Sequence, residues 1–171
     1  MPPAAAAFSW LAVEWIHRGK PTALGIVSGL VAGLVVITPA AGFVPPWAAI
    51  VMGLLVSPIC YFAVLMKDRL GYDDSLDAFG IHGVGGILGA LLTGVFADKA
   101  LNDAGNNGLL HGNAGQLGVQ ALGVVACSAY AAIVTFILLK VIGATIGLRV
   151  AEPEEREGLD TTQHGEEGYA I

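Results

Sequence analysis

Four long apolar stretches constrain the fold of this chain more than any other feature. They run over Pro21–Phe43, Trp47–Met66, Asp77–Ala97 and Leu117–Leu148, and each contains few charged residues. A helix needs about 20 apolar residues to cross roughly 30 Å of hydrocarbon, and helices satisfy their own backbone hydrogen bonds there. Hydrophobic residues make up 55% of the sequence and charged residues only 13%. The sequence therefore predicts an all-α membrane protein, a helical bundle.

A shorter apolar segment precedes these four. Residues 1–16 are apolar but end at His17 and Arg18, which is less than a full span. No basic residues precede the segment, as they would in a signal peptide. We expect a partial helix over 1–16, a transmembrane bundle over 1–148 and a C-terminal tail over 149–171. The partial helix predicts that the chain is a piece of a longer protein.

The basic residues of the connectors predict the orientation. Two bases lie in 17–20, two lie in 67–69, and Lys140, Arg149 and Arg156 lie at the end of the last span and in the tail. If successive spans cross the membrane in opposite directions, these three regions lie on the same side of it. On the other side, the connectors 42–46 and 98–116 contain Lys99 as their only base. The positive-inside rule then places the tail in the cytoplasm.

The acidity of the chain is local to the tail. Residues 149–171 contain seven acids and two bases, a net charge of −5 out of −6 for the whole chain. Nucleic-acid binding requires basic patches, so no nucleic-acid partner is expected. We expect residues 1–148 to be surrounded by the lipid bilayer.

One ionisable side chain, His82, lies inside the apolar part of the third long stretch. An ionisable group at bilayer depth is costly and is a functional-site candidate by default. Three interpretations are open: a hydrogen-bonded structural histidine, a metal ligand, or a side chain that lines a pathway for a small polar solute or a proton. No second ligand stands three or four residues away, which argues against a metal. Neutral imidazole has one donor and one acceptor nitrogen, which suits the pathway.

Acidic residues mark the start of the same helix. Asp74-Ser75-Leu76-Asp77 resembles a capping box with an acid at its last position. Carboxylates also suit the positive end of the helix dipole. We expect Asp74 and Asp77 to cap or support this helix.

Small residues are expected to pack against neighbouring backbones. At 3.6 residues per turn, Gly86, Gly89 and Thr93 lie at about +40°, −20° and +20° around the axis from His82. Gly85 and Gly89 also form a GxxxG pair. Such a stripe admits another backbone or leaves a narrow channel beside the imidazole. In the first of the four long stretches, 21–43, Gly25, Gly29 and Gly33 are spaced by four and predict a second close contact.

The stretch around His82 resembles the ammonium transporter family (Amt/Mep/Rh), in particular its Amt branch. The resemblance rests on Asp74–Gly86 with Leu92–Ala97, on Thr38–Val44, and on the tail segments Gly147–Val150, Glu155–Asp160 and His164–Glu166. It covers essentially all of this chain, but only the C-terminal part of a family member. It implies an eleven-helix fold with inverted repeats and a homotrimer. The present spans would then match the end of the seventh helix and the four helices that follow.

The resemblance implies a function and roles for single residues. It implies transport of ammonium or ammonia across the plasma membrane through a hydrophobic pore that contains histidine, with no enzymatic activity and no cofactor. His82 matches the second of two pore histidines, and Ala78 matches an apolar pore-lining position. Asp77 matches an acid that helps to hold the start of the helix. The alternative function is a non-conducting truncated membrane subunit that associates with a full-length transporter.

The tail has two interpretations. Its residues alone are typical of a solvated acidic end. The resemblance implies a regulatory region that packs on the cytoplasmic face, with Arg149, Arg156, Gly158 and Asp160 among its residues. It also implies a PII-type signal protein as a partner at that face.

Overall fold

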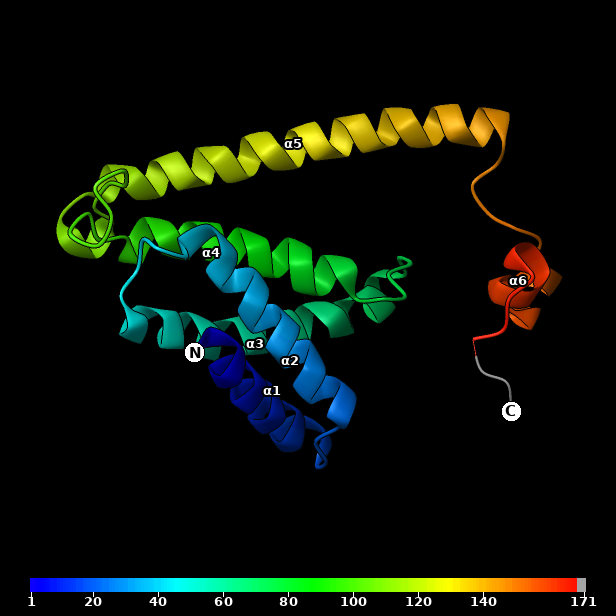
Figure 1. The fold of residues 1–171 in the computed structure, drawn as a ribbon, viewed down its shortest axis with the longest axis horizontal. Helices are drawn as coiled ribbons and strands as arrows, with labels where there is room; N and C mark the ends of the chain where they lie inside the picture. Colours follow the sequence, from blue (N-terminus) through cyan, green and yellow to red (C-terminus); the bar gives the residue numbers. More distant parts are fainter. Residues whose placement is uncertain (169–171) are drawn as a thin grey trace. The chain divides into compact units, whose positions relative to one another are not determined.

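The computed structural model describes residues 1–168, and every regular element among them is helical (Figure 1). The predicted all-α fold class is confirmed. The helices are α1 (Pro2–Arg18), α2 (Ala23–Ile37), α3 (Pro46–Leu70), α4 (Val84–Phe96), α5 (Ala114–Thr145) and α6 (Glu152–Glu157). Two 3-10 turns, η1 (Thr38–Ala40) and η3 (Leu109–His111), and two π-helical turns, η2 (Phe79–Gly83) and η4 (Asp160–His164), complete the order.

Four helical segments are long and apolar enough to cross a membrane. They are Ala23–Ala40, Pro46–Leu70, Phe79–Phe96 and Ala114–Thr145. Their ends differ from the apolar runs by a few residues, because hydropathy alone does not separate a helix from an apolar connector. The largest difference is in α3, which continues beyond Met66 to Leu70 and ends at Gly71, whose φ of 69° lies in the left-handed region. Lys67 is therefore part of this helix and not of a loop.

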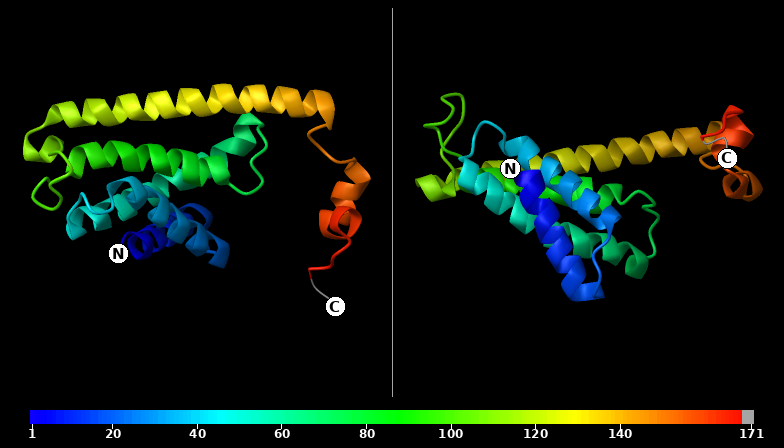
Figure 2. Two further views of the ribbon diagram at one scale, coloured as in Figure 1. Left: turned by 45° about the horizontal axis from the view of Figure 1, so that its top comes forward. Right: turned by 60° about the horizontal axis from the view of Figure 1, so that its bottom comes forward.

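The chain divides into two units, residues 1–126 and 127–171, and each is described by itself. The first unit contains α1 to α4, the loop that follows, and the first turns of α5. Within it, α1 packs against both α2 and α3, and α4 packs against the same two helices (Figure 2).

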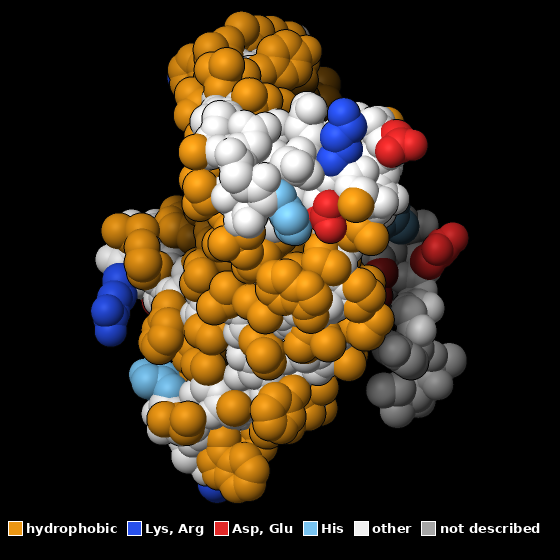
Figure 3. All heavy atoms as spheres, turned by 90° about the vertical axis from the view of Figure 1, so that its left-hand side faces the viewer, with side chains coloured by type: hydrophobic (Ala, Val, Ile, Leu, Met, Phe, Trp, Pro, Cys, Tyr) orange, Lys and Arg blue, Asp and Glu red, His pale blue; other side chains and the backbone are white. Residues whose placement is uncertain are grey.

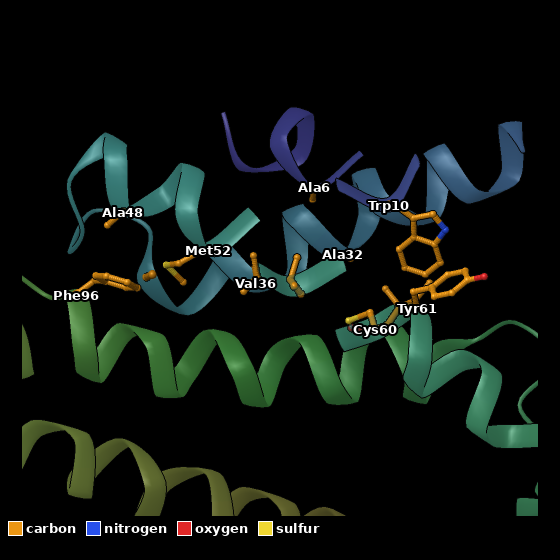
Figure 4. Close-up of a cluster of buried hydrophobic side chains, with 12 residues drawn as sticks. Ala6, Trp10, Ala32, Val36, Ala48, Met52, Cys60, Tyr61 and Phe96 are labelled. Carbon is orange, nitrogen blue, oxygen red and sulfur yellow. Dashed lines mark hydrogen bonds between the residues drawn. The ribbon is translucent and has the colours of Figure 1, made fainter. Parts of the chain in front are cut away.

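The core of the first unit combines side chains from all four of these helices (Figure 4). Trp10 of α1 meets Tyr61 of α3 edge to face, with ring centroids 5.6 Å apart. Glycines allow α1 and α2 to approach: a Cβ on Gly29 would lie 2.7 Å from Trp10 Cβ, and one on Gly33 would lie 2.5 Å from Pro3 Cα. The close packing expected of the Gly25, Gly29, Gly33 spacing is confirmed.

Much of the apolar surface remains uncovered. Hydrophobic side chains dominate the face in Figure 3, where charged side chains are few. In α5, no residue is buried. In water, these apolar side chains would be driven into a core. Their exposure on the helices therefore indicates surfaces that contact lipid or further protein.

Candidate functional site

The carboxylate of Asp74 organises the start of the helix that carries His82. Its oxygens accept hydrogen bonds from the backbone N–H groups of Ala78, Phe79 and Gly80, at 2.8, 3.1 and 3.3 Å. The first N–H groups of any helix lack partners within the helix. One side chain four residues upstream of Ala78 therefore supplies the acceptors for the whole first turn.

Asp77 and Lys67 form a second support. The Lys67 ammonium binds the Asp77 carboxylate and also donates to the backbone carbonyl of Asp74 at 2.9 Å. Asp77 itself has φ of 55°, in the left-handed region. The end of α3 is in this way tied to the residue that precedes the helix. In the sequence, Lys67 serves only as one of the basic residues that predict the orientation in the membrane. A lysine ten residues before an aspartate is not a recognisable motif, so the pair with Asp77 could not be predicted.

A π-helical turn, η2, follows directly. The N–H of Val84 donates to the carbonyl of Phe79, five residues back, instead of four. Two contacts hold this turn on α3. Gly80 lies so close that a Cβ there would come within 2.8 Å of Val64 Cγ2, and the Cys60 thiol donates to the Ile81 carbonyl at 3.8 Å. Gly80 and Ile81 are buried as a result.

His82 is the first residue after this buried pair, and it is exposed. Its ring has no hydrogen bond with any residue between 1 and 168. Within the same described range, no group of three or more His, Cys, Asp or Glu could hold a metal ion. Ala78, one turn earlier, is also exposed. The two residues expected to line a pathway are thus both exposed in this unit.

The small residues expected beside His82 lie in two different environments. Gly85, Gly89 and Thr93 are buried, and a Cβ on Gly89 would lie 2.4 Å from the Val36 carbonyl oxygen of α2. A Cβ on Gly86, in contrast, would meet no atom within 4 Å. The π turn affects a different relationship. It adds one residue to the turn that contains His82, and since each residue rotates an α-helix by about 100°, His82 does not keep the angular register with Gly86, Gly89 and Thr93 that an unbroken α-helix would give.

A buried carboxylate at the end of α1 escaped the sequence prediction. Glu14 is only 3% exposed, and its carboxylate binds Thr22 at the start of α2. The signal was present, since Glu14 is the one charged residue in the apolar segment 1–16. The argument that singles out His82, an ionisable group among apolar residues, applies to it equally.

The tail residues belong to the second unit. Arg149 makes a two-pronged contact with Glu155, through Nε to Oε2 at 2.7 Å and Nη2 to Oε1 at 2.6 Å. The guanidinium hydrogen bond holds the pKa of Glu155 below its ordinary value. Arg156 pairs with Glu152 one turn earlier in α6.

Gly158 and Asp160 shape the end of α6. Gly158 has φ of 112° and accepts a hydrogen bond from the Thr162 N–H at 3.1 Å, while the Asp160 carbonyl accepts one from the Glu166 N–H at 2.8 Å. In these contacts, the acids that pair with the two arginines lie within the same tail.

Comparison with known proteins gives a consistent result. The model of the Ammonium Transporter Family matches residues 1–169. An ammonium transporter of Aquifex aeolicus is 54% identical over 97% of this chain, and one of Bacillus subtilis is 47% identical over the same share. The chain spans 39% and 41% of the length of these two relatives.

Solved structures agree with the sequence matches. The structure of Saccharomyces cerevisiae Mep2 superposes with a TM-score of 0.86 at 38% identity, covering 99% of this chain and 40% of that one. A structure described as a sensor Amt protein superposes with a TM-score of 0.82 at 31% identity, over 95% of this chain and 39% of its own.

Proposed function

The chain belongs to the ammonium transporter family, and from this we propose that it forms the C-terminal part of a pore that carries ammonium or ammonia across the plasma membrane. The observation that carries the proposal is the family match over residues 1–169. The position of His82 supports it, because an exposed imidazole in a candidate span, without a partner in residues 1–168, needs a polar neighbour.

The cost of moving a charge determines whether ammonium or ammonia passes the apolar part of such a pore. An ammonium ion is costly to move through an apolar bore, whereas neutral ammonia is not. His82 has one donor and one acceptor nitrogen when neutral. It therefore offers a hydrogen bond to ammonia, or relays a proton, without placing a permanent charge in the apolar surroundings. Ala78 lines the same route with an apolar side chain.

The proposal includes an orientation and partners. The ends of α1 and α3 carry Arg18 and Lys67 and lie with the tail on the cytoplasmic side, as the positive-inside rule requires. The complete protein is a homotrimer. Its tail, with Arg149 and the acids and Arg156 of α6, presents charged side chains to neighbouring protomers and to a PII-type signal protein.

Replacement of His82 tests its role in the pore. In the protein expressed from its native gene, His82→Ala should lower methylammonium uptake about fivefold or more, or change the ammonium-dependent current, since one lost hydrogen bond at the barrier is worth about 1 kcal/mol or more. His164→Ala, an exposed histidine of the tail, is the matched control. Unchanged uptake with loss of the trimer on a native gel would contradict the proposal and favour a structural histidine.

A second candidate function is a non-conducting subunit that associates with a complete transporter. The uncovered apolar faces and the exposed His82 favour this alternative, because they suit association with further helices. The protein purified after expression from its native gene and placed in liposomes separates the two functions. Under the first proposal it takes up methylammonium alone, whereas a non-conducting subunit changes uptake only when a full-length transporter is present.

A further inference from the structure

Asp77 has a backbone conformation that few residues other than glycine adopt. Among residues 1–168 it is the only residue other than glycine with a positive φ, at 55°. The left-handed region is disfavoured for a residue with a Cβ, so this conformation needs support from its surroundings. Such positions concentrate at functional sites, and this one lies five residues before His82.

The contacts that enforce this conformation come from Lys67. Its ammonium binds the Asp77 carboxylate and the Asp74 carbonyl together, so it fixes the residues on both sides of the turn at 75–76. A backbone hydrogen bond closes the same turn, because the Asp77 N–H donates to the Asp74 carbonyl at 3.0 Å. The two side chains of the pair are 21% and 28% exposed, which leaves them only partly solvated.

The conformation of Asp77 determines how the helix starts. The carbonyl of Asp77 accepts from the Ile81 N–H at 2.9 Å, as in an α-helix, whereas the bond from Val84 to Phe79 is of the π type. If Asp77 returned to the right-handed region, the direction in which the chain enters this turn would change, while α4 stays packed against α2 and α3. The π turn would then relax, and residues 78–82 would rotate by up to about 100° relative to α4.

We propose that Lys67 is a positioning residue: by holding Asp77 in the left-handed region, it selects the π turn and so sets the direction of His82. The inference rests on the proposed function only where it takes His82 as pore-lining. In this arrangement Ile81 is buried against α3 and His82 is exposed. Without Lys67, the exposure of the two positions exchanges.

Thiol labelling measures this exchange without measuring transport. In a Cys127→Ser background, which removes the exposed native thiol and keeps the buried Cys60, His82→Cys should react with a small thiol reagent much faster than Ile81→Cys. Adding Lys67→Met should lower the ratio of the two rates about tenfold or more. Lys67→Arg should preserve the ratio. Arg69→Met, which removes a cation from the same last turn of α3, should leave it unchanged.

A second substitution distinguishes backbone selection from a simple ion pair. Glycine adopts a positive φ at little cost, so Asp77→Gly added to Lys67→Met should restore the labelling ratio although both charged partners are gone. The proposal is overturned if Lys67→Met leaves the ratio unchanged, or if Asp77→Gly fails to restore it. If Lys67→Met alone does not fold, recovery of folded protein by Asp77→Gly supports the proposal, and its absence overturns it.

Transport then separates this inference from the proposed function. In the protein expressed from its native gene, Lys67→Met should reduce methylammonium uptake, and Asp77→Gly should recover it. If the labelling ratio changes as stated but uptake does not, Lys67 positions His82 and the pore assignment of His82 is wrong.

Discussion

The carboxylate of Glu14 in α1 accepts two hydrogen bonds from Thr22, the residue that caps α2. The backbone N–H and the hydroxyl of Thr22 each lie 3.0 Å from a carboxylate oxygen. The hydroxyl in turn accepts from the Gly25 N–H at 2.9 Å. Since a carboxylate near a helix N-terminus is favoured by the helix dipole, Glu14 closes the α1–α2 hairpin with a charge that suits its position.

Removal of this carboxylate should destabilise the first unit. Glu14→Ala leaves the Thr22 N–H without its partner in a partly buried site, and hydrogen bonds to charged groups are worth about 1.5–3 kcal/mol. We expect a loss of unfolding free energy of that order, measured by thermal or denaturant unfolding in detergent. Glu14→Gln keeps an acceptor oxygen and should lose less. An alanine variant as stable as the parent would show that the contact contributes nothing.

Two glycines three residues apart in α4 should respond differently to the same change. Gly89→Ala places a Cβ against the Val36 carbonyl, so either α2 or α4 must shift, and overpacking of this kind costs about 1–3 kcal/mol. Gly86→Ala meets open space and should be neutral. Unfolding of this chain in detergent measures both.

The same pair reports on whatever covers α4 in a longer protein. If Gly86→Ala is harmless in this chain but damages the protein expressed from its native gene, a further element packs on that face. Equal tolerance of alanine at Gly86 and Gly89 in this chain would contradict the close α2–α4 contact.

Asp74 should be required for the start of the His82 helix. Asp74→Ala removes the acceptor for three backbone N–H groups, and loss of an N-cap costs about 0.5–2 kcal/mol. Hydrogen exchange of Phe79 and Gly80 amides should become faster, while amides in the middle of α4 change little. Asp74→Asn keeps one acceptor oxygen and is the matched control. Unchanged exchange at the two amides would show that the cap is dispensable.

The sequence predicts the spans and the capping acids because these depend on local features. An apolar run of the right length predicts a span, and an acid before it predicts an N-cap, whatever the rest of the fold. The family motif around His82 adds the fold. The role of Lys67 depends instead on how the end of α3 meets a residue ten positions later, and no local pattern contains that information.

The π turn was missed for a different reason. Almost every position from Ala78 to Phe96 is apolar or glycine, so one additional residue leaves no trace in the hydrophobic periodicity. In a water-soluble helix, the shift would appear as a break in the polar face. Here it appears only in the structure, in the hydrogen bond from the Val84 N–H to the Phe79 carbonyl.

The tail should lose its Arg149–Glu155 contact in acid. Arg149 donates to Glu155 and holds the pKa of this carboxyl below its ordinary value of 4.5. A carboxyl with a lowered pKa contributes its interaction above the ordinary value and loses it as the pH falls through the lowered one. The contact should therefore be intact at neutral pH and lost as the pH falls below 4.5.

Carbon NMR of the Glu155 carboxyl during an acid titration measures this directly. Arg149→Gln should return the pKa toward its ordinary value, whereas Arg156→Gln, which removes the partner of Glu152, should not. Both groups of the pair are exposed, so about 1 M salt, with a Debye length near 3 Å, should reduce the shift. A titration that Arg149→Gln does not change would mean that the two side chains are not in contact in solution.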